Sequence, residues 1–122
     1  MAGAAVLGVA GGASADPGVG NIGSGYTTSG AGVWCVQHNL NYIISHQSGN
    51  PPYRNLSEDS TWGPQTAADV RWYQASVNLQ ADGVVGQQTG TSLILNGDKY
   101  YNGDTWNGPG YCYYKMPGTI TG

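Results

Sequence analysis

The sequence predicts a mainly helical fold: a small three-helix bundle with two related turn–helix repeats, then an irregular Tyr- and Gly-rich C-terminal extension held by one disulfide. Three observations predict it. The region 59–93 contains one pattern twice, the region 33–46 has helical periodicity, and the chain has two cysteines. At 122 residues the chain has room for one domain and little more.

The repeated pattern has a period of 23 residues. Its equivalent pairs are Asp59 and Asp82, Gly63 and Gly86, Gln65 and Gln88, Thr66 and Thr89, and Val70 and Leu93. A fixed period over several positions indicates one structural unit used twice. Two copies are too few for a solenoid, so the repeat predicts a small domain with internal pseudo-symmetry.

Each unit is typical of a turn that leads into a helix. An aspartate accepts hydrogen bonds from nearby backbone N–H groups and so fixes a tight loop. The glycine that follows allows a backbone shape that other residues resist. We therefore assign Asp59, Gly63, Asp82 and Gly86 to loop structure. Pro64 suits the first position of a helix, where its missing N–H would have no partner.

The first helix is predicted over 33–46, where the apolar residues recur at steps of three and four. This apolar stripe consists of Val33, Val36, Leu40, Ile43 and Ile44. Gly and Pro residues at 48–52 end the helix. The second helix is predicted over 65–75, with Asn78 in the left-handed position that follows a helix end.

These residues resemble the peptidoglycan-binding domain-like family. The string Asp-x-x-Trp-Gly-Pro-x-Thr-x-x-x-Val-x-x-Tyr-Gln begins at Asp59, and Leu-x-x-Asp-Gly-x-Val-Gly-x-x-Thr-x-x-x-Leu follows and ends at Leu93. The upstream Val-Gln-x-x-Leu-Asn at 36–41 resembles the family's first helix. The resemblance implies a three-helix domain over 33–95, of the kind that anchors bacterial cell-wall hydrolases and sometimes occurs alone.

Three positions depart from the family's pattern. Asp69 stands where the family has Ala, Gln87 where it has Pro, and Gly90 where it has Trp. A glycine inside a helix costs about 1 kcal/mol relative to alanine. Gly90 therefore predicts a third helix that is short or poorly packed by itself.

The resemblance implies that the ligand is peptidoglycan, either its glycan or its stem peptide. To bind such a ligand, a protein would use side-chain amides, exposed aromatic faces and a helix N-terminus that receives a carboxylate of the ligand. The candidate ligand-binding residues are Trp62, Gln65, Arg71, Trp72 and Gln88. Trp62 has a second interpretation, because the family uses that position for core packing. The aromatic residues of the extension have two interpretations also, as stacking surfaces for sugar rings or as a cover over the first helix.

The two ends of the chain differ in composition from the domain. Residues 1–15 are predicted to be the remnant of a signal peptide, because an apolar run at 4–10 precedes the small-x-small pattern Ala13-Ser-Ala15. Residues 16–32 are rich in Gly, Ser and Thr and are predicted to form a flexible leader. Residues 96–122 are predicted to be an ordered extension that packs on the domain, with a short strand at 111–114.

Cys35 and Cys112 are the only cysteines. In an exported chain two cysteines predict one disulfide. A bridge over this length of chain contributes about 4 kcal/mol in the chain-entropy model, which matters for a core of about 60 residues. A competing interpretation makes Cys35 a catalytic nucleophile with His38 one helical turn away, as in a small cell-wall hydrolase.

Other chemistry has weaker support in the sequence. Charged residues make up 9% of the chain and its formal net charge is −3, which argues against nucleic acid and against anionic membranes. His38 and His46 are too far apart in the sequence for a helical zinc pair, and Asp98, Asn102 and Asp104 do not follow a calcium-loop spacing. We expect no cofactor and no metal. A glycosidase would have to draw its carboxylates from Glu58, Asp59, Asp69 or Asp82.

The resulting expectation is a secreted, monomeric, non-catalytic module that binds peptidoglycan outside the cell or in its wall. Two alternatives stay open. The first is a secreted effector or inhibitor that uses the same fold to bind a protein partner. The second is the small cell-wall hydrolase.

Overall fold

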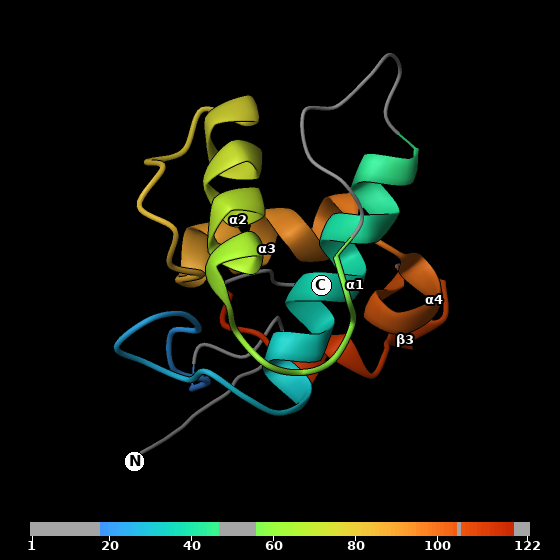
Figure 1. Ribbon diagram of the computed structural model, residues 1–122. Coiled ribbons are helices and arrows are strands. Elements are labelled where there is room, and N and C mark those ends of the chain that lie inside the picture. Colours follow the sequence, from blue (N-terminus) through green and yellow to red (C-terminus); the bar gives the residue numbers. More distant parts are fainter. Residues whose placement is uncertain (1–17, 47–55, 105, 119–122) are drawn as a thin grey trace.

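The computed structural model describes residues 18–46, 56–104 and 106–118 and shows a mainly helical domain (Figure 1). Its three long helices are α1 (Ala31–Ser45), α2 (Pro64–Ser76) and α3 (Gln87–Asn96). The extension adds the one-turn helix α4 (Lys99–Asn102), strands β2 (Gly103–Asp104) and β3 (Gly108–Pro109), and the 3₁₀ helix η1 (Cys112–Tyr114). The predicted fold class is confirmed.

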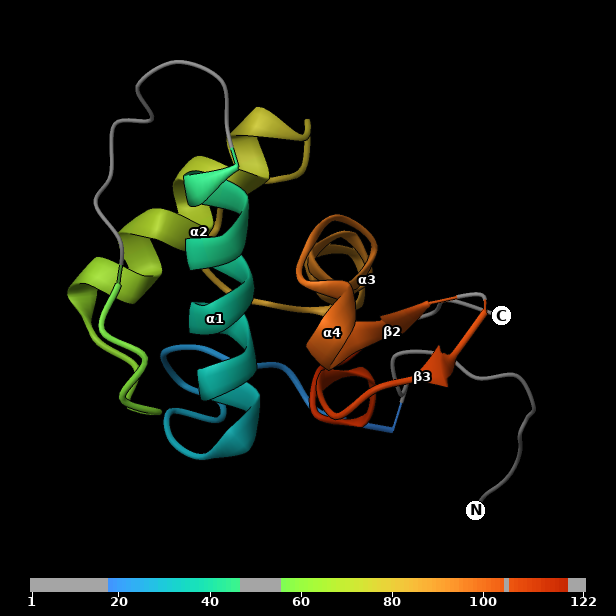
Figure 2. The same cartoon turned by 90° about the vertical axis from the view of Figure 1, so that its right-hand side faces the viewer.

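Helix α1 is the central element of the fold. It contacts both α2 and α3, and η1 packs against it as well. In Figure 2, α2 crosses α1 obliquely, and α3, α4 and the two strands lie to the right of α1. The predicted stripe is buried as the 3.6-residue period requires, with Val33, Val36 and Leu40 fully inside the core. No helix of the described residues is long and apolar enough to cross a membrane.

Helices α2 and α3 begin in the same way. Each has an extended glycine at its N-cap, Gly63 and Gly86, and Pro64 occupies the first turn of α2. After α2, Asn78 has a left-handed backbone (φ 63°), as predicted for the residue that follows a helix end. The N–H of the next residue, Leu79, then donates to the carbonyl of Gln74 at 2.8 Å.

Helix α3 is longer and better packed than its glycine predicts. It spans 10 residues, and Leu93 and Ile94 lie in the core. Gly90 is buried, and a Cβ atom there would overlap with the carbonyl oxygen of Pro117. The extension approaches the helix so closely at this point that only glycine fits. The departure from the family's pattern at position 90 therefore has a steric cause in this chain.

The segment before α1 belongs to the packed structure in its described part. Ile22 is 1% exposed and joins the core. Its backbone N–H and carbonyl exchange hydrogen bonds with Val85 at 3.0 and 2.8 Å. Residues 16–32 were expected to form a flexible leader; in the described part, residues 18–32, one buried isoleucine and backbone pairing hold this Gly-rich segment against the domain. The predicted signal peptide at 1–15 lies outside the described residues.

The extension is stapled to α1. Cys35 and Cys112 form the predicted disulfide, with their Cα atoms 5.6 Å apart and both side chains buried. The predicted strand at 111–114 is wrong, because these residues form the 3₁₀ helix η1 instead. The strands are β2 and β3, which pair as an antiparallel hairpin. The side chain of Met116 completes this side of the core.

Candidate functional site

The first repeat turn is organised by a buried glutamine from α1. The Nε2 atom of Gln37 donates to Asp59 Oδ1 at 3.2 Å, to the Thr61 carbonyl at 3.0 Å and to Thr66 Oγ1 at 3.2 Å. Its Oε1 atom accepts from the N–H of Ser60 at 3.0 Å. Asp59 Oδ1 also accepts from the Thr61 N–H at 3.0 Å. One side chain therefore holds the turn and the start of α2 together.

The second repeat turn has the same arrangement around Gln74. Its Nε2 atom donates to Asp82 Oδ1, the Val84 carbonyl and Thr89 Oγ1, each at 3.0 Å. Its Oε1 atom accepts from the N–H of Gly83 at 3.0 Å. Asp82 Oδ1 accepts from the N–H of Val84 at 2.9 Å. The 23-residue repeat in the sequence thus corresponds to a repeat of hydrogen bonds.

The aspartates of both turns are occupied in these networks. The backbone N–H of Thr61 and, next, the amide of Gln37 stabilise the carboxylate of Asp59 and hold its pKa below the usual value. This is the geometry of a loop that is fixed by its own carboxylate, and it accounts for the aspartate at the start of each unit.

The predicted ligand-binding residues occupy different environments. Trp62 is buried in the core, and its indole Nε1 has no hydrogen-bond partner among the described residues. Trp72 is half-buried and packs against the core. Gln65, in the first turn of α2, is exposed and donates to Asp69 Oδ1 at 3.0 Å. The burial of Trp62 matches its interpretation as a core residue.

The other two predicted residues are exposed. The side chain of Arg71 lies over Gly83, with its Nη1 atom 2.8 Å from the position that a Cβ atom of that residue would take. This contact places α2 against the second turn. Gln88 is exposed in the first turn of α3. The predicted set therefore consists of one buried tryptophan, one half-buried tryptophan and three exposed polar side chains.

An open groove lies elsewhere, at the junction of α1, the first repeat turn and the extension. Its volume is about 500 Å³. The lining consists of Gly30, Ala31, Trp34, Ser60, Tyr101 and Tyr111. None of these side chains is charged, and three of them are aromatic. Such a lining suits a ligand with flat, apolar faces and a few polar groups.

The aromatic rings of the groove are arranged around Trp34. The Tyr101 ring lies 5.0 Å from the Trp34 ring at 70°, and the Tyr111 ring lies 6.4 Å away at 77°. The His38 ring stacks on Trp34 with the centroids 4.7 Å apart and an interplanar angle of 4°. Edge-to-face and stacked contacts of this kind are the preferred geometries of aromatic pairs. Trp34 is thus supported by rings from its own helix and from the extension.

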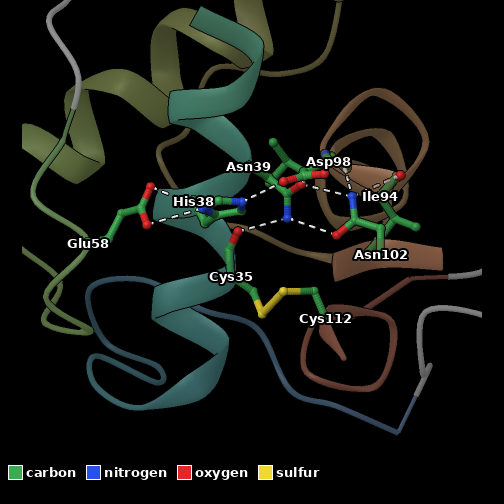
Figure 3. Close-up of a disulfide and its surroundings, with 9 residues drawn as sticks. Cys35, His38, Asn39, Glu58, Ile94, Asp98, Asn102 and Cys112 are labelled. Atoms are coloured by element: carbon green, nitrogen blue, oxygen red, sulfur yellow. Dashed lines mark hydrogen bonds and ion pairs between the residues drawn. A yellow bond between two sulfur atoms is a disulfide. The ribbon is translucent and has the colours of Figure 1, made fainter. Parts of the chain in front are cut away.

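His38 lies between two carboxylates (Figure 3). Its Nδ1 atom is 3.1 Å from both carboxylate oxygens of Glu58, and its Nε2 atom is 2.8 Å from Asp98 Oδ2. Burial of the ring opposes protonation, but the hydrogen bonds with Asp98 and Glu58 outweigh it and raise the pKa of His38 above 6.5. The protonated imidazole donates to both carboxylates and so joins α1, the segment before the first turn, and the N-cap of α4.

A buried pair of asparagines adds a second link between α1 and the extension. Asn39 Nδ2 donates to the Cys35 carbonyl at 2.8 Å and to Asn102 Oδ1 at 3.1 Å. Asn102 Nδ2 donates to Asn39 Oδ1 at 2.8 Å and to the Ile94 carbonyl at 3.1 Å. Asn39 Oδ1 also accepts from the N–H of Asp98 at 2.9 Å. Figure 3 shows these bonds next to the disulfide, and together they fix the extension against α1.

The structure contradicts a cysteine nucleophile. The sulfur of Cys35 is bonded to that of Cys112, and the residue is fully buried, so it supplies no thiolate. His38 is directed at carboxylates instead. Within the described ranges, no group of three or more His, Cys, Asp or Glu side chains is placed to hold a metal ion.

The groove was not predicted from the sequence. Its residues come from three regions without a shared pattern, and only the Tyr residues of the extension were suspected. The aromatic residues of the extension differ in their exposure. Tyr113 is buried and covers the core, whereas Tyr100, Trp106, Tyr111 and Tyr114 are exposed.

Comparison with known proteins identifies the repeat-containing segment. A family model described as "Putative peptidoglycan binding domain" matches residues 36–93. This segment includes both glutamine-centred turns and the helices that follow them. Searches of curated proteins and of solved structures found no significant match. The match supports peptidoglycan as the general ligand class. Residues 36–93 belong to the peptidoglycan binding domain family.

Proposed function

We propose that this protein is a secreted, monomeric, non-catalytic module that binds bacterial peptidoglycan and holds itself at the cell wall. The observation that carries the proposal is the groove at the edge of the family segment, with its three aromatic side chains Trp34, Tyr101 and Tyr111. The groove is lined by Gly30, Ala31 and Trp34 at the start of α1, by Ser60 of the matched segment, and by Tyr101 and Tyr111 of the extension. The fold therefore presents one open surface that suits a carbohydrate-rich polymer.

Two further features support a location outside the cytoplasm. The chain contains a disulfide, and such bridges persist in oxidising compartments. The apolar run at 4–10 and the pattern Ala13-Ser-Ala15 are typical of an export signal. The non-catalytic role is supported against the cysteine-nucleophile alternative, since the sulfur of Cys35 is held in the disulfide.

The exposed polar residues of the repeat helices form a second candidate surface for the same ligand. Gln65 and Gln88 stand in the first turns of α2 and α3, and Arg71 lies over the second turn. These are the residues whose family-based role remains a prediction. Variants of them test whether the wall is bound at the groove, at the repeat helices or at both.

The test is a pull-down of the oxidised protein on purified insoluble peptidoglycan. We expect retention of the wild type and a clear loss for Tyr111→Ala, with Gln65→Ala and Gln88→Ala run in parallel. Circular dichroism confirms that each variant is folded, and size-exclusion chromatography measures the oligomeric state. Wild-type protein that passes through unretained, while a secreted protein co-purifies with it, contradicts wall binding and favours the protein-partner alternative. Solubilisation of the wall by the protein contradicts the non-catalytic role.

A further inference from the structure

We infer that the groove binds the glycan strand of peptidoglycan, through its N-acetylated sugar rings, and not the stem peptide. The inference rests on the proposed function, because it names which part of the same polymer is recognised. It comes from three properties of the groove: the orientation of its rings, the kind of polar groups beside them, and the charge around it.

The rings provide two walls at nearly a right angle. Trp34 forms one wall, and its orientation is fixed by the stacked ring of His38. Tyr111 forms the other, at 77° to Trp34, and is 53% exposed. The flat face of a pyranose ring carries C–H bonds with a small positive charge, and an aromatic face is negative. A sugar that stacks on one wall therefore presents its edge to the other.

The polar side-chain groups of the lining are the hydroxyls of Ser60, Tyr101 and Tyr111 and the indole N–H of Trp34. A hydroxyl both donates and accepts hydrogen bonds. This matches the hydroxyl and acetamido groups of an amino sugar, which also offer both. A volume of about 500 Å³ lies within the range of small-molecule sites, which suits a short piece of a strand.

The charge around the groove disfavours a stem peptide. The lining has no charged side chain, and beside it His38 holds Glu58 and Asp98, so that the cluster has one more negative than positive charge when the histidine is protonated. Lys115 is the cation in contact with a lining ring, 5.4 Å from the centroid of Tyr111. Stem peptides carry free carboxylates, which the two acidic side chains repel. A sugar chain whose lactyl groups are in amide linkage carries no such charge.

The experiment compares two soluble ligands on the intact oxidised protein. The first is an N-acetylglucosamine tetramer, together with glycan strands that an amidase has stripped of stem peptides and whose freed lactyl carboxylates have then been amidated. The second is the free stem peptide. Binding is measured by tryptophan fluorescence and calorimetry. We expect the two glycan probes to bind and the peptide not to bind. Tyr111→Ala should weaken glycan binding about tenfold, as the loss of one aromatic contact predicts.

Tyr114→Ala is the matched control. Tyr114 is 55% exposed and lies three residues from Tyr111, but it does not line the groove. We expect it to bind glycan as the wild type does. Trp34→Tyr, which keeps an aromatic ring, should retain more affinity than Trp34→Ala, and circular dichroism checks that both are folded.

The outcomes separate this inference from the proposed function. Retention on whole peptidoglycan with no binding of either glycan probe, or with binding of the stem peptide alone, overturns the inference and leaves wall binding intact. Equal losses for Tyr111→Ala and Tyr114→Ala overturn it also, because the groove would not be the site. Binding of the glycan probes without retention on the insoluble wall supports the inference and contradicts the proposed function.

Discussion

Gln37 and Gln74 make equivalent hydrogen bonds in the two halves of the domain, although they come from different helices. Each amide donates to an aspartate, to a backbone carbonyl two residues later and to a threonine in the next helix, and each accepts a backbone N–H. Gln37 lies 22 residues before its aspartate, whereas Gln74 lies 8 residues before its own. The internal symmetry of the domain is therefore a symmetry of buried polar groups.

The first prediction concerns these two glutamines. Gln74→Ala should lower the free energy of unfolding by about 2–4 kcal/mol, because it removes several buried hydrogen bonds and leaves the Gly83 N–H without its acceptor. Gln37→Ala should have a similar effect. Gln88→Ala, at an exposed position, should change the value by less than about 0.5 kcal/mol. Urea denaturation measures all three, and a small loss for both buried residues would show that the turns hold without them.

The second prediction concerns the disulfide. Cys35→Ala with Cys112→Ala should lower the free energy of unfolding by about 4 kcal/mol, since the bridge closes a loop with a sequence separation of 77. Tyr111 precedes Cys112, so the unbridged protein should also lose affinity for the wall. Denaturation with and without a reductant gives the first quantity, and the pull-down gives the second. Unchanged retention after reduction would mean that the extension keeps its place without the disulfide, through the Asn39–Asn102 bonds, the His38–Asp98 pair and its buried side chains.

The third prediction concerns pH and Asp69. Its carboxyl group is buried, one oxygen has no hydrogen-bond partner among the described residues, and burial raises its pKa to about 6 despite the bond from Gln65. Between pH 4 and 6 the folded state then binds more protons than the unfolded state, so this group's contribution to stability falls as pH rises and is constant above. Its full size is about 3 kcal/mol.

Asp69→Ala, which restores the residue usual in the family, should remove the loss of stability that accompanies the rise in pH. The difference in unfolding free energy between the variant and the wild type, measured in urea from pH 4 to pH 7, should shift in favour of the variant as pH rises. Gln65→Ala should move this loss of stability to higher pH, because it removes the hydrogen bond that stabilises the charged form of Asp69. A difference that is independent of pH would show that Asp69 has an ordinary pKa in the folded protein.

The fourth prediction concerns His38. Its pKa is raised in the folded state, so the stability it adds is fully present below the unfolded value near 6.5 and is lost as pH rises through the folded value. NMR titration of the ring should give a pKa above 6.5. Glu58→Gln and Asp98→Asn should each lower it, because each removes a charged partner. A pKa at or below 6.5 in the wild type would contradict the raised value.

The fifth prediction concerns Gly90. Gly→Ala inside a helix usually adds about 1 kcal/mol of stability, but here we expect a loss. The new methyl group would displace the Pro117 carbonyl and, with it, the buried side chain of Met116. Gly20→Ala, at a position with open space around it, should change the unfolding free energy by less than about 0.5 kcal/mol. A stabilising Gly90→Ala would mean that the extension moves aside at little cost.

Much of the fold was predictable because it depends on local pattern. The apolar stripe of α1, the Gly-Pro start of α2 and the 23-residue repeat each correspond to an element that forms over a few turns of chain. The disulfide was predictable from a count, since two cysteines allow only one pairing. Trp62 was a candidate ligand-binding residue with core packing as its second interpretation, and the family pattern alone did not decide between them; the structure places it in the core.

The candidate groove could not be predicted in the same way. Trp34 borders the stripe of α1, Ser60 is one residue of a turn, and Tyr101 and Tyr111 lie in a Gly- and Asn-rich segment without periodicity. Ile22 was likewise missed, because a single apolar residue in a polar segment has no pattern. In each case the burial or exposure of the side chain depends on contacts with residues distant in the sequence.

The sequence by itself determined the three helices, the paired turns, the disulfide and the family of residues 36–93. It could do so because helix periodicity and turn chemistry act over short stretches of chain. Only the tertiary structure decided that Gln37 and Gln74 are equivalent, that Pro117 requires a glycine at position 90, and that three aromatic residues meet in one groove. These relationships form only when the disulfide and the polar links bring the extension against α1, which is a matter of long-range packing.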